Sequence, residues 1–254
     1  MKKRLDTILV EKGFVNSKHK AQRLIMEGVV FVNNVKIDKP GKKFSDDVKI
    51  FIKEKLKYVS RGGLKLEHAL NYFKINVKDK ICMDIGASTG GFTHCLLEFG
   101  AKKVYAIDVG YGQLDYFLRN DKRVVNIERC NFRYIEKDKI PEQVDLITID
   151  VSFISLKLII PKALQFLKKS GEIIALIKPQ FEVGKNEVEK GGVIRDEKKH
   201  EKVLKDFEKF FSSINLNLIG FVQSPILGQK GNKEFFAYLK KEKFNDFNTI
   251  DNNN

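Results

Sequence analysis

The sequence predicts an α/β protein: a small N-terminal α+β domain followed by a Rossmann-like domain with a seven-stranded, mostly parallel sheet. Three observations support this fold class. Positive charge is concentrated in the N-terminal part of the chain, over residues 1–80. Beyond that part, apolar strand patterns alternate with helical patterns, as in doubly wound sheets. Several of these strands end in a charged residue, and ligands bind beyond the carboxyl ends of such strands.

The composition is that of a folded, basic protein. The chain has 254 residues and a formal net charge of +14. Residues 1–80 hold 20 Lys and Arg against 9 Asp and Glu, a net +11, which leaves +3 for the remainder. This asymmetry favours a polyanionic partner, nucleic acid ahead of an anionic membrane. No apolar run approaches the roughly 20 residues that span a bilayer, and no signal-peptide core is present. We therefore expect a cytoplasmic protein without stable membrane insertion.

Residues 1–56 are predicted to form two helices and a small sheet. Leu5, Ile8 and Leu9 fall at helical spacing. Ser17 is a suitable N-cap for a second helix, and Gly28 ends that helix. Further strands are expected over 29–32, 35–37 and 48–52, the first two joined by an Asn-Asn turn that tolerates positive φ.

A resemblance to a known RNA-binding domain covers this region. The segments 17–21 and 25–34 resemble the S-four RNA-binding domain, over about residues 3–55. That family commonly has Arg where Lys18 stands and Gly where Asn34 stands, and both departures preserve charge or turn chemistry. The resemblance implies RNA contact through Lys18, Lys20 and Arg23 on the second helix.

The middle of the chain begins with a strand–loop–helix–strand unit. A strand over 80–86 enters a glycine-rich loop, a helix follows over 92–99, and a second strand covers 104–108. Glycines let the backbone approach a ligand closely. Asp108 stands at the end of the second strand, where a carboxylate can accept both ribose hydroxyls of an adenosine bound at the loop.

Three interpretations of this loop compete. Dinucleotide binding requires GxGxxG, but Ser88 occupies the second glycine position, and Asp84 would repel a pyrophosphate. S-adenosylmethionine carries a positive sulfonium and ammonium, which suit an acidic neighbour better. Residues 86–90 also match the GxSxG nucleophile elbow of serine hydrolases, with only His94 and His200 downstream as possible bases. The residues favour the methyl donor and leave the other two open.

Two later strands add further charged ends. The strand over 144–150 ends in Asp150, and the strand over 173–178 ends in Lys178. Amino-group methyltransferases often carry a Pro-Pro pair here, which this chain lacks. Cytosine-carbon methylation needs a cysteine nucleophile, often after proline, and no cysteine of this chain follows proline. The cysteines also form no CxxC pair, so we expect no metal. What remains is an oxygen acceptor, and a lysine between carboxylates and near a second ammonium can deprotonate it.

Six segments in order resemble the TlyA family. They are Tyr58–Leu66, Asp84–Thr93, Asp108–Leu114, Asp150–Ser155, Lys178–Glu182 and Gly191–Asp196. Members are ribosomal RNA ribose 2′-O-methyltransferases, often called haemolysins, with an S-four domain before an FtsJ-like methyltransferase domain. The resemblance implies S-adenosylmethionine as cofactor and a cytidine 2′-hydroxyl of ribosomal RNA as acceptor. The short chain ends are similar to those of members that modify the large subunit alone.

The resemblance also implies a Lys-Asp-Lys-Glu catalytic set. By motif match, Lys65 positions the substrate, Lys178 is the base, and Asp150 and Glu234 orient it. The resemblance also implies a second group of residues that contact the methyl donor: Asp84, Gly86, Ser88, Thr89, Gly90, Asp108 and Asn131. Within this group, Asn131 is assigned to the adenine edge.

These expectations divide the chain into an RNA-binding domain over 1–56, a linker over 57–64, a methyltransferase domain over 65–243 and a disordered tail over 244–254. Strands over 216–222 and 235–239 should close the sheet as an antiparallel pair. Two other functions remain as alternatives to the enzyme. One is a membrane-active haemolysin, and the other is an RNA-binding ribosome factor without chemistry.

Overall fold

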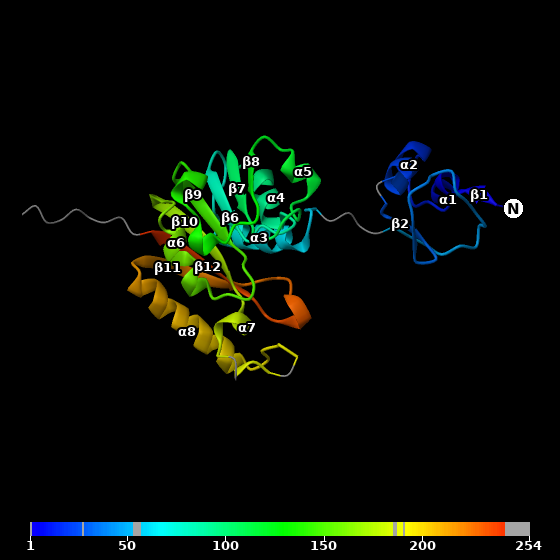
Figure 1. Ribbon diagram of the computed structural model, residues 1–254. Helices are drawn as coiled ribbons and strands as arrows, with labels where there is room; N and C mark the ends of the chain where they lie inside the picture. Colours follow the sequence, from blue (N-terminus) through cyan, green and yellow to red (C-terminus); the bar gives the residue numbers. More distant parts are fainter. Residues whose placement is uncertain (1, 27, 53–56, 185–186, 190, 242–254) are drawn as a thin grey trace, which may run out of the picture. The chain divides into compact units, whose positions relative to one another are not determined.

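The computed structural model describes residues 2–26, 28–52, 57–184, 187–189 and 191–241 (Figure 1). The chain divides into two compact units, residues 1–56 and 57–254. Residues 57–64, expected to link the domains, belong to the second unit in the structure. Tyr58 is buried in the core of that unit, and helix α3 begins at Arg61. The tail expected over 244–254 lies outside the described residues.

The first unit has the expected helices and hairpin. Its elements are β1 (Lys3–Arg4), α1 (Leu5–Glu11), α2 (Lys18–Met26), β2 (Val30–Val32), β3 (Val35–Ile37), β4 (Lys43–Phe44) and β5 (Ile50–Ile52). The main sheet has the order β3-β2-β5, and β1 pairs with β4. Ser17 caps α2, because its Oγ accepts from the Lys20 amide at 3.2 Å. Asn33 and Asn34 have φ of 48° and 65°, which confirms the predicted turn.

The second unit is a doubly wound α/β domain. Its strands are β6 (Ile81–Ile85), β7 (Lys103–Ile107), β8 (Val124–Ile127), β9 (Val144–Ile149), β10 (Leu167–Ile177), β11 (Leu216–Gln223) and β12 (Phe235–Lys241). Its helices are α3 (Arg61–Tyr72), α4 (Gly91–Glu98), α5 (Tyr116–Arg119), α6 (Ile160–Ala163), α7 (Pro179–Glu182) and α8 (Glu197–Ser213). The sheet order is β11-β12-β10-β9-β6-β7-β8, and among these described strands β12 runs opposite to the other six. The predicted seven-stranded sheet and its closing antiparallel pair are therefore confirmed.

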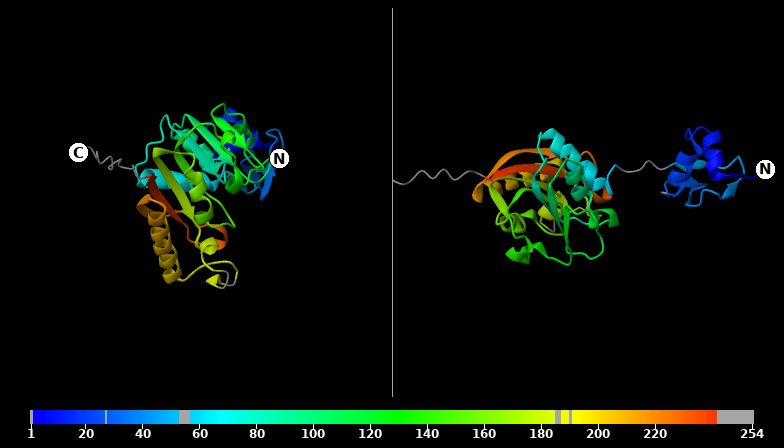
Figure 2. Two further views of the ribbon diagram at one scale, coloured as in Figure 1. Left: turned by 60° about the vertical axis from the view of Figure 1, so that its left-hand side comes forward. Right: turned by 90° about the horizontal axis from the view of Figure 1, so that it is seen from above.

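Two apolar cores lie on the two faces of this sheet. Alternate strand residues serve each face: Cys82 packs with α3, α4 and α5, whereas Met83 packs with α6 and α8. Figures 1 and 2 show α3 and α4 on the side of the sheet away from α8. This layering fixes the strands between two helical layers.

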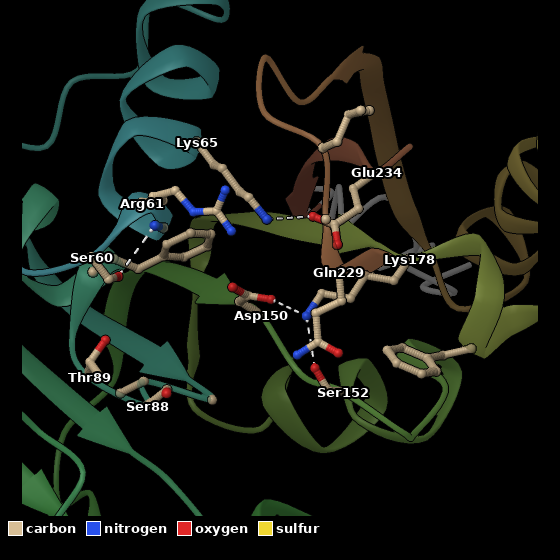
Figure 3. A pocket seen from close by; sticks show the side chains of 18 of the residues that line it. Ser60, Arg61, Lys65, Ser88, Thr89, Asp150, Ser152, Lys178, Gln229 and Glu234 are labelled. Carbon is tan, nitrogen blue, oxygen red and sulfur yellow. Dashed lines mark hydrogen bonds and ion pairs between the residues drawn. The ribbon is translucent and has the colours of Figure 1, made fainter. Parts of the chain in front are cut away.

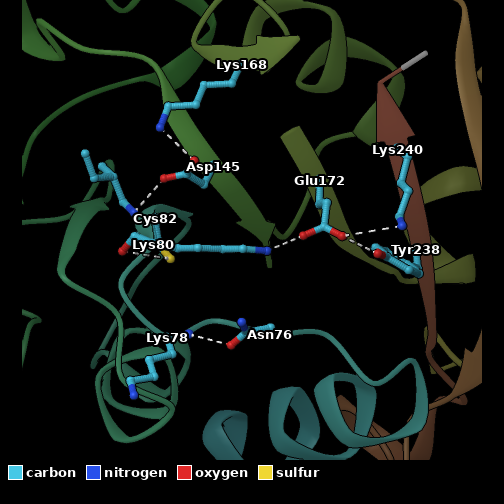
Figure 4. Close-up of polar contacts among 10 residues, drawn as sticks. Asn76, Lys78, Lys80, Cys82, Asp145, Lys168, Glu172, Tyr238 and Lys240 are labelled. Atoms are coloured by element: carbon cyan, nitrogen blue, oxygen red, sulfur yellow. Dashed lines mark hydrogen bonds and ion pairs between the residues drawn. The ribbon is translucent and has the colours of Figure 1, made fainter. Parts of the chain in front are cut away.

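The starts of several strands are held together by polar contacts (Figure 4). The Glu172 carboxylate on β10 accepts from Lys80 and from the Tyr238 hydroxyl on β12. Asp145 on β9 lies 2.7 Å from the Lys168 ammonium and accepts from the Ile81 amide at 2.9 Å. These contacts link β6, β9, β10 and β12 at the end of the sheet opposite the carboxyl ends of the parallel strands.

Candidate active site

Two lysine–carboxylate pairs form the centre of the site (Figure 3). Lys178 Nζ lies 2.6 Å from Asp150 Oδ1 and donates to Ser152 Oγ at 3.0 Å. Lys65 Nζ lies 2.7 Å from Glu234 Oε2. All five residues line one cavity of about 340 Å³. The four residues of the expected catalytic set are thus brought together.

The fold explains why these residues meet. Asp150 directly follows β9, and Lys178 directly follows β10, so both lie at the carboxyl edge of the parallel strands. Glu234 directly precedes β12, which runs antiparallel and therefore starts at that same edge. Lys65 comes from the second turn of α3, whose first turn is capped by Ser60, with Oγ accepting from the Gly62 amide at 3.3 Å.

The pairing within the set differs from the expectation. Glu234 was expected to orient Lys178 together with Asp150, but its carboxylate binds Lys65 instead. Ile177 and Phe235 are partners in the sheet, so the backbones of the next residues, Lys178 and Glu234, are adjacent at its end. The Lys178 ammonium nevertheless pairs with Asp150. The Glu234 side chain is 3 % exposed and faces α3, which supplies Lys65.

Backbone close to Glu234 restricts its carboxylate. A Cβ added at Gly228 would lie 1.9 Å from Glu234 Oε1, so only glycine lets the preceding loop pass this close. The carboxylate is therefore enclosed between that loop and Lys65. Glu234, at the start of the apolar strand β12, is therefore a buried carboxylate paired with Lys65.

A second cavity, of about 510 Å³, adjoins the first. Asp108 and Asn131 line it, together with apolar side chains that include Ile107, Phe132 and Ile159. Both cavities are lined by Gly86, Ser88, Asp150, Ser152 and Gln229. A ligand in the second cavity can therefore reach the two lysine–carboxylate pairs of the first.

Asp108 holds the glycine-rich loop in place. Its carboxylate accepts from the Ser88 amide and from the Gly110 amide, each at 2.7 Å. Ser88 has φ of 49°, in the left-handed region, which turns this amide toward Asp108. The predicted contact residues Gly86, Ser88 and Thr89 line the first cavity.

Two of the expected donor contacts do not reach either cavity. Asp84 is fully buried, and its carboxylate accepts from Thr93 Oγ1 at 2.7 Å and Thr148 Oγ1 at 3.1 Å. Burial raises the pKa of Asp84 to about 7. Gly90 is the N-cap of α4 with φ of 93°, and a Cβ there would lie 2.3 Å from the Leu118 side chain. The structure thus places Asp84 and Gly90 behind the loop rather than on the cavity walls, and donor contact through them stays a prediction.

The expected RNA contacts lie in the first unit. Lys18, Lys20 and Arg23 are exposed on α2, whose other side buries Ala21 and Ile25. The helix thus presents these three side chains on its exposed side, and RNA contact through them stays a prediction.

Several lining residues were not predicted. Ser60, Arg61, Ser152, Gln180, Phe181 and Gln229 all line the first cavity. All except Gln229 lie in segments that carry the family resemblance, so their neighbourhood was indicated although their roles were not. Gln229 comes from the loop before β12, and no sequence pattern marks it.

The serine hydrolase interpretation lacks its base. Within the described parts of the chain, neither downstream histidine contacts Ser88. His94 Nδ1 accepts from the Val59 amide at 3.2 Å, and His200 is buried with Nε2 3.2 Å from the Ile194 carbonyl oxygen. Among the same residues, no helix has the length and apolar character to cross a bilayer, and no cluster of three His, Cys, Asp or Glu could hold a metal.

Comparison with known proteins identifies the family. The FtsJ-like methyltransferase family matches residues 58–241, and the S4 domain matches residues 3–49. "Putative rRNA methyltransferase YqxC" of Bacillus subtilis (strain 168) is 50 % identical over 240 residues, covering 94 % of this chain and 85 % of that protein. "16S/23S rRNA (cytidine-2'-O)-methyltransferase TlyA" of Mycobacterium tuberculosis (strain ATCC 25618 / H37Rv) is 39 % identical over 241 residues, covering 94 % and 90 %.

A solved structure gives the same result. The "Putative hemolysin from Streptococcus thermophilus" superposes with a TM-score of 0.73 at 45 % identity, covering 95 % of this chain and 89 % of that one. The chain therefore belongs to the FtsJ-like methyltransferase family, in the group that includes the TlyA proteins, and carries an N-terminal S4 domain. The resemblance found in the sequence is confirmed, and the family implies S-adenosylmethionine as methyl donor.

Proposed function

We propose that this methyltransferase transfers a methyl group from S-adenosylmethionine to the ribose 2′-hydroxyl of a cytidine in ribosomal RNA. The observation that carries the proposal is the junction of the two cavities at Asp150. There a cavity suited to an adenosine meets a cavity that holds two lysine–carboxylate pairs. The hydroxyl of an RNA ribose and the donor methyl group can meet at such a junction.

The second cavity fits the donor in its chemistry. Asp108 offers a carboxylate to the ribose hydroxyls, and Asn131 offers an amide to the adenine edge. Ile107, Phe132 and Ile159 supply an apolar surface for the base. When bound, the donor supplies an electrophilic methyl group on a sulfonium, and the Asp150 carboxylate at the junction suits that positive charge.

Lys178 is the residue that we assign as base. In its neutral form, Nζ accepts the proton of the 2′-hydroxyl while the ribose oxygen forms its bond to the methyl carbon and the carbon–sulfur bond breaks. Asp150 and Ser152 hold Nζ at 2.6 and 3.0 Å, which fixes its direction toward the cavity. Positioning of the reacting atoms is the main contribution of the protein.

Lys65 and Glu234 are assigned to the acceptor side. The Lys65 ammonium, held by Glu234 at 2.7 Å, faces the same cavity as Lys178 and can bind the ribose or an adjacent phosphate. Glu234 therefore acts on the substrate through Lys65, which replaces the direct contact with Lys178 that the sequence suggested.

Ribosomal RNA is supported as the substrate by independent features. The relative from M. tuberculosis is named for cytidine 2′-O-methylation of 16S and 23S rRNA and is 39 % identical. The S4 match places an RNA-binding domain over 3–49, where α2 exposes Lys18, Lys20 and Arg23. The excess positive charge over residues 1–80 fits a polyanion.

The role of Lys178 is tested with two variants. Lys178→Met removes the amine, and Lys178→Arg keeps a cation for Asp150 but cannot become neutral at working pH. We expect both to lose at least about a hundredfold in turnover, with S-adenosylhomocysteine binding by calorimetry nearly unchanged. Retained turnover in Lys178→Arg would show that the cation, not the base, is what matters.

The matched control lies at the opposite edge of the sheet. Lys168 also pairs with an aspartate, Asp145, at 2.7 Å, but far from both cavities. Lys168→Met should leave turnover near that of the wild type. Equal loss in Lys168→Met and Lys178→Met would indicate damage to the fold rather than to the chemistry.

A further inference from the structure

The outer face of the sheet in the first unit carries an unusual pair of aromatic side chains. Phe31 on β2 and Phe51 on β5 contact each other with ring centroids 6.3 Å apart. Phe51 is 61 % exposed, and Phe31 is partly exposed. Exposing phenylalanine to water is unfavourable in free energy, so two neighbouring exposed rings on one face indicate an interaction site.

The register of the strands puts a lysine in the same row. Phe31 is the direct partner of Lys36 on β3 and of Phe51 on β5, so the three side chains lie on one face. Val30, Val32 and Ile37 alternate with them and are buried on the other face against the helices.

A second lysine stands at the edge of this row. Lys49 precedes Phe51 by two positions and is exposed. Its amide and carbonyl are both bonded to Asn33, at 3.1 and 2.9 Å, which fixes this stretch beside the β2–β3 turn. The face therefore holds two aromatic rings together with two exposed lysine positions, and the Lys36 ammonium reaches over Gly28.

We propose that this aromatic face, formed by Phe31, Phe51, Lys36 and Lys49, binds an unpaired nucleotide of the RNA substrate by stacking. The inference rests on the proposed function, because it takes that RNA as the occupant. Aromatic rings beside cations are the combination that binds single-stranded RNA: the rings stack on the bases and the lysines attract the phosphates.

Charge complementarity favours RNA over a second copy of the chain. Residues 1–80 carry a net charge of +11, so two copies of this face would repel each other. The face is also separate from the cations of α2, because the helix packs on the opposite, buried side of the sheet. The unit would thus hold RNA at two places, a charged helix and a stacking surface.

The chain offers a direct reporter, because it contains no tryptophan. Phe51→Trp places a single indole on the aromatic face, and stacking on a base quenches its fluorescence. The control Phe14→Trp places an indole at another exposed phenylalanine of the same unit, 42 % exposed, on the loop between α1 and α2.

Both variants are titrated, in the full-length chain, with a fluorescein-labelled single-stranded oligoribonucleotide of about 12 nucleotides. Anisotropy of the label measures binding, and indole emission measures stacking. We expect quenching in Phe51→Trp that follows the anisotropy, little change in Phe14→Trp, and less quenching when the same strand is annealed into a duplex. Binding without quenching in Phe51→Trp would overturn the proposal.

A second measurement removes the rings. The double variant Phe31→Ala, Phe51→Ala should bind the oligoribonucleotide roughly tenfold more weakly, whereas Phe14→Ala should match the wild type. Circular dichroism checks that the first unit stays folded. Unchanged affinity, or a shift from dimer to monomer by sedimentation instead, would contradict stacking on RNA. Methyl transfer is scored separately, so its failure with intact quenching would overturn the proposed function alone.

Discussion

Asp84 provides a sharp test of how the loop is supported. The carboxyl is fully buried between Thr93 of α4 and Thr148 of β9, and its pKa is raised to about 7 mainly by burial. The perturbation is Asp84→Asn, which has the same shape, stays neutral, and can still exchange hydrogen bonds with both hydroxyls.

The sign of the expected effect follows from proton linkage. The pKa rises from 3.8 to about 7 on folding, so the native state binds this proton more tightly than the unfolded state. The resulting stabilisation is complete below the unfolded value and is lost as pH rises to about 7. At 1.36 kcal/mol per unit, the wild type loses about 2 kcal/mol between pH 5.5 and 8 through this group. The Asp84→Asn variant has no such loss of stability, because asparagine does not ionise.

The assay is urea unfolding followed by circular dichroism at the two pH values. The free energy of unfolding of Asp84→Asn minus that of the wild type should increase by about 2 kcal/mol from pH 5.5 to pH 8. Asp145→Asn is the control, because despite partial burial the pKa of Asp145 is lowered by the Lys168 ammonium and other partners, so it stays ionised in both states over this range. A pH-independent difference for Asp84→Asn would refute a buried, protonated carboxyl.

Two further predictions concern the cavities. Glu234→Gln leaves the Lys65 ammonium without its charged partner and should lower the free energy of unfolding by about 3 kcal/mol, measured by urea titration. The double variant with Lys65→Met should recover part of that stability but no turnover; a strictly additive loss would show that the two side chains are not coupled. Asp108→Asn should weaken S-adenosylhomocysteine binding by about 2 kcal/mol, roughly thirtyfold by calorimetry, and unchanged affinity would remove Asp108 from the donor site.

The sequence predicted the fold, and it placed Asp108, Asp150 and Lys178 at one end of the sheet, because both depend on regular geometry. Lys65 and Glu234 entered the proposed catalytic set through the family resemblance alone. Parallel strands end at one edge of a sheet, so a charge after each apolar run indicates Asp108, Asp150 and Lys178 together. The antiparallel closing strand brings Glu234 to the same edge, because β12 begins where β10 ends.

The details that sequence patterns do not reveal depend on side-chain direction and on contacts between layers. Asp84 lies one position before the end of β6, on the same face as Cys82, which α4 covers. Asp108 lies one position beyond the end of β7 and is free to reach the loop. Sequence patterns place strand ends only to within a residue or two, so the two acids looked equivalent.

The pairing of Glu234 was equally hidden. Its partner Lys65 comes from a helix 169 residues earlier in the chain, and only the packing of α3 against the sheet brings the two together. The sequence offered two carboxylates and two lysines, and it could not assign the pairs.

Cytidine 2′-O-methylation of ribosomal RNA by this chain can be measured by methyl transfer itself. The purified chain is incubated with labelled S-adenosylmethionine and separated ribosomal subunits, and the RNA is then digested to nucleosides. We expect label in 2′-O-methylcytidine, and the subunit that carries it defines the substrate. Label in a base-methylated nucleoside, or none in either subunit with donor binding intact, would contradict cytidine 2′-O-methylation of these subunits.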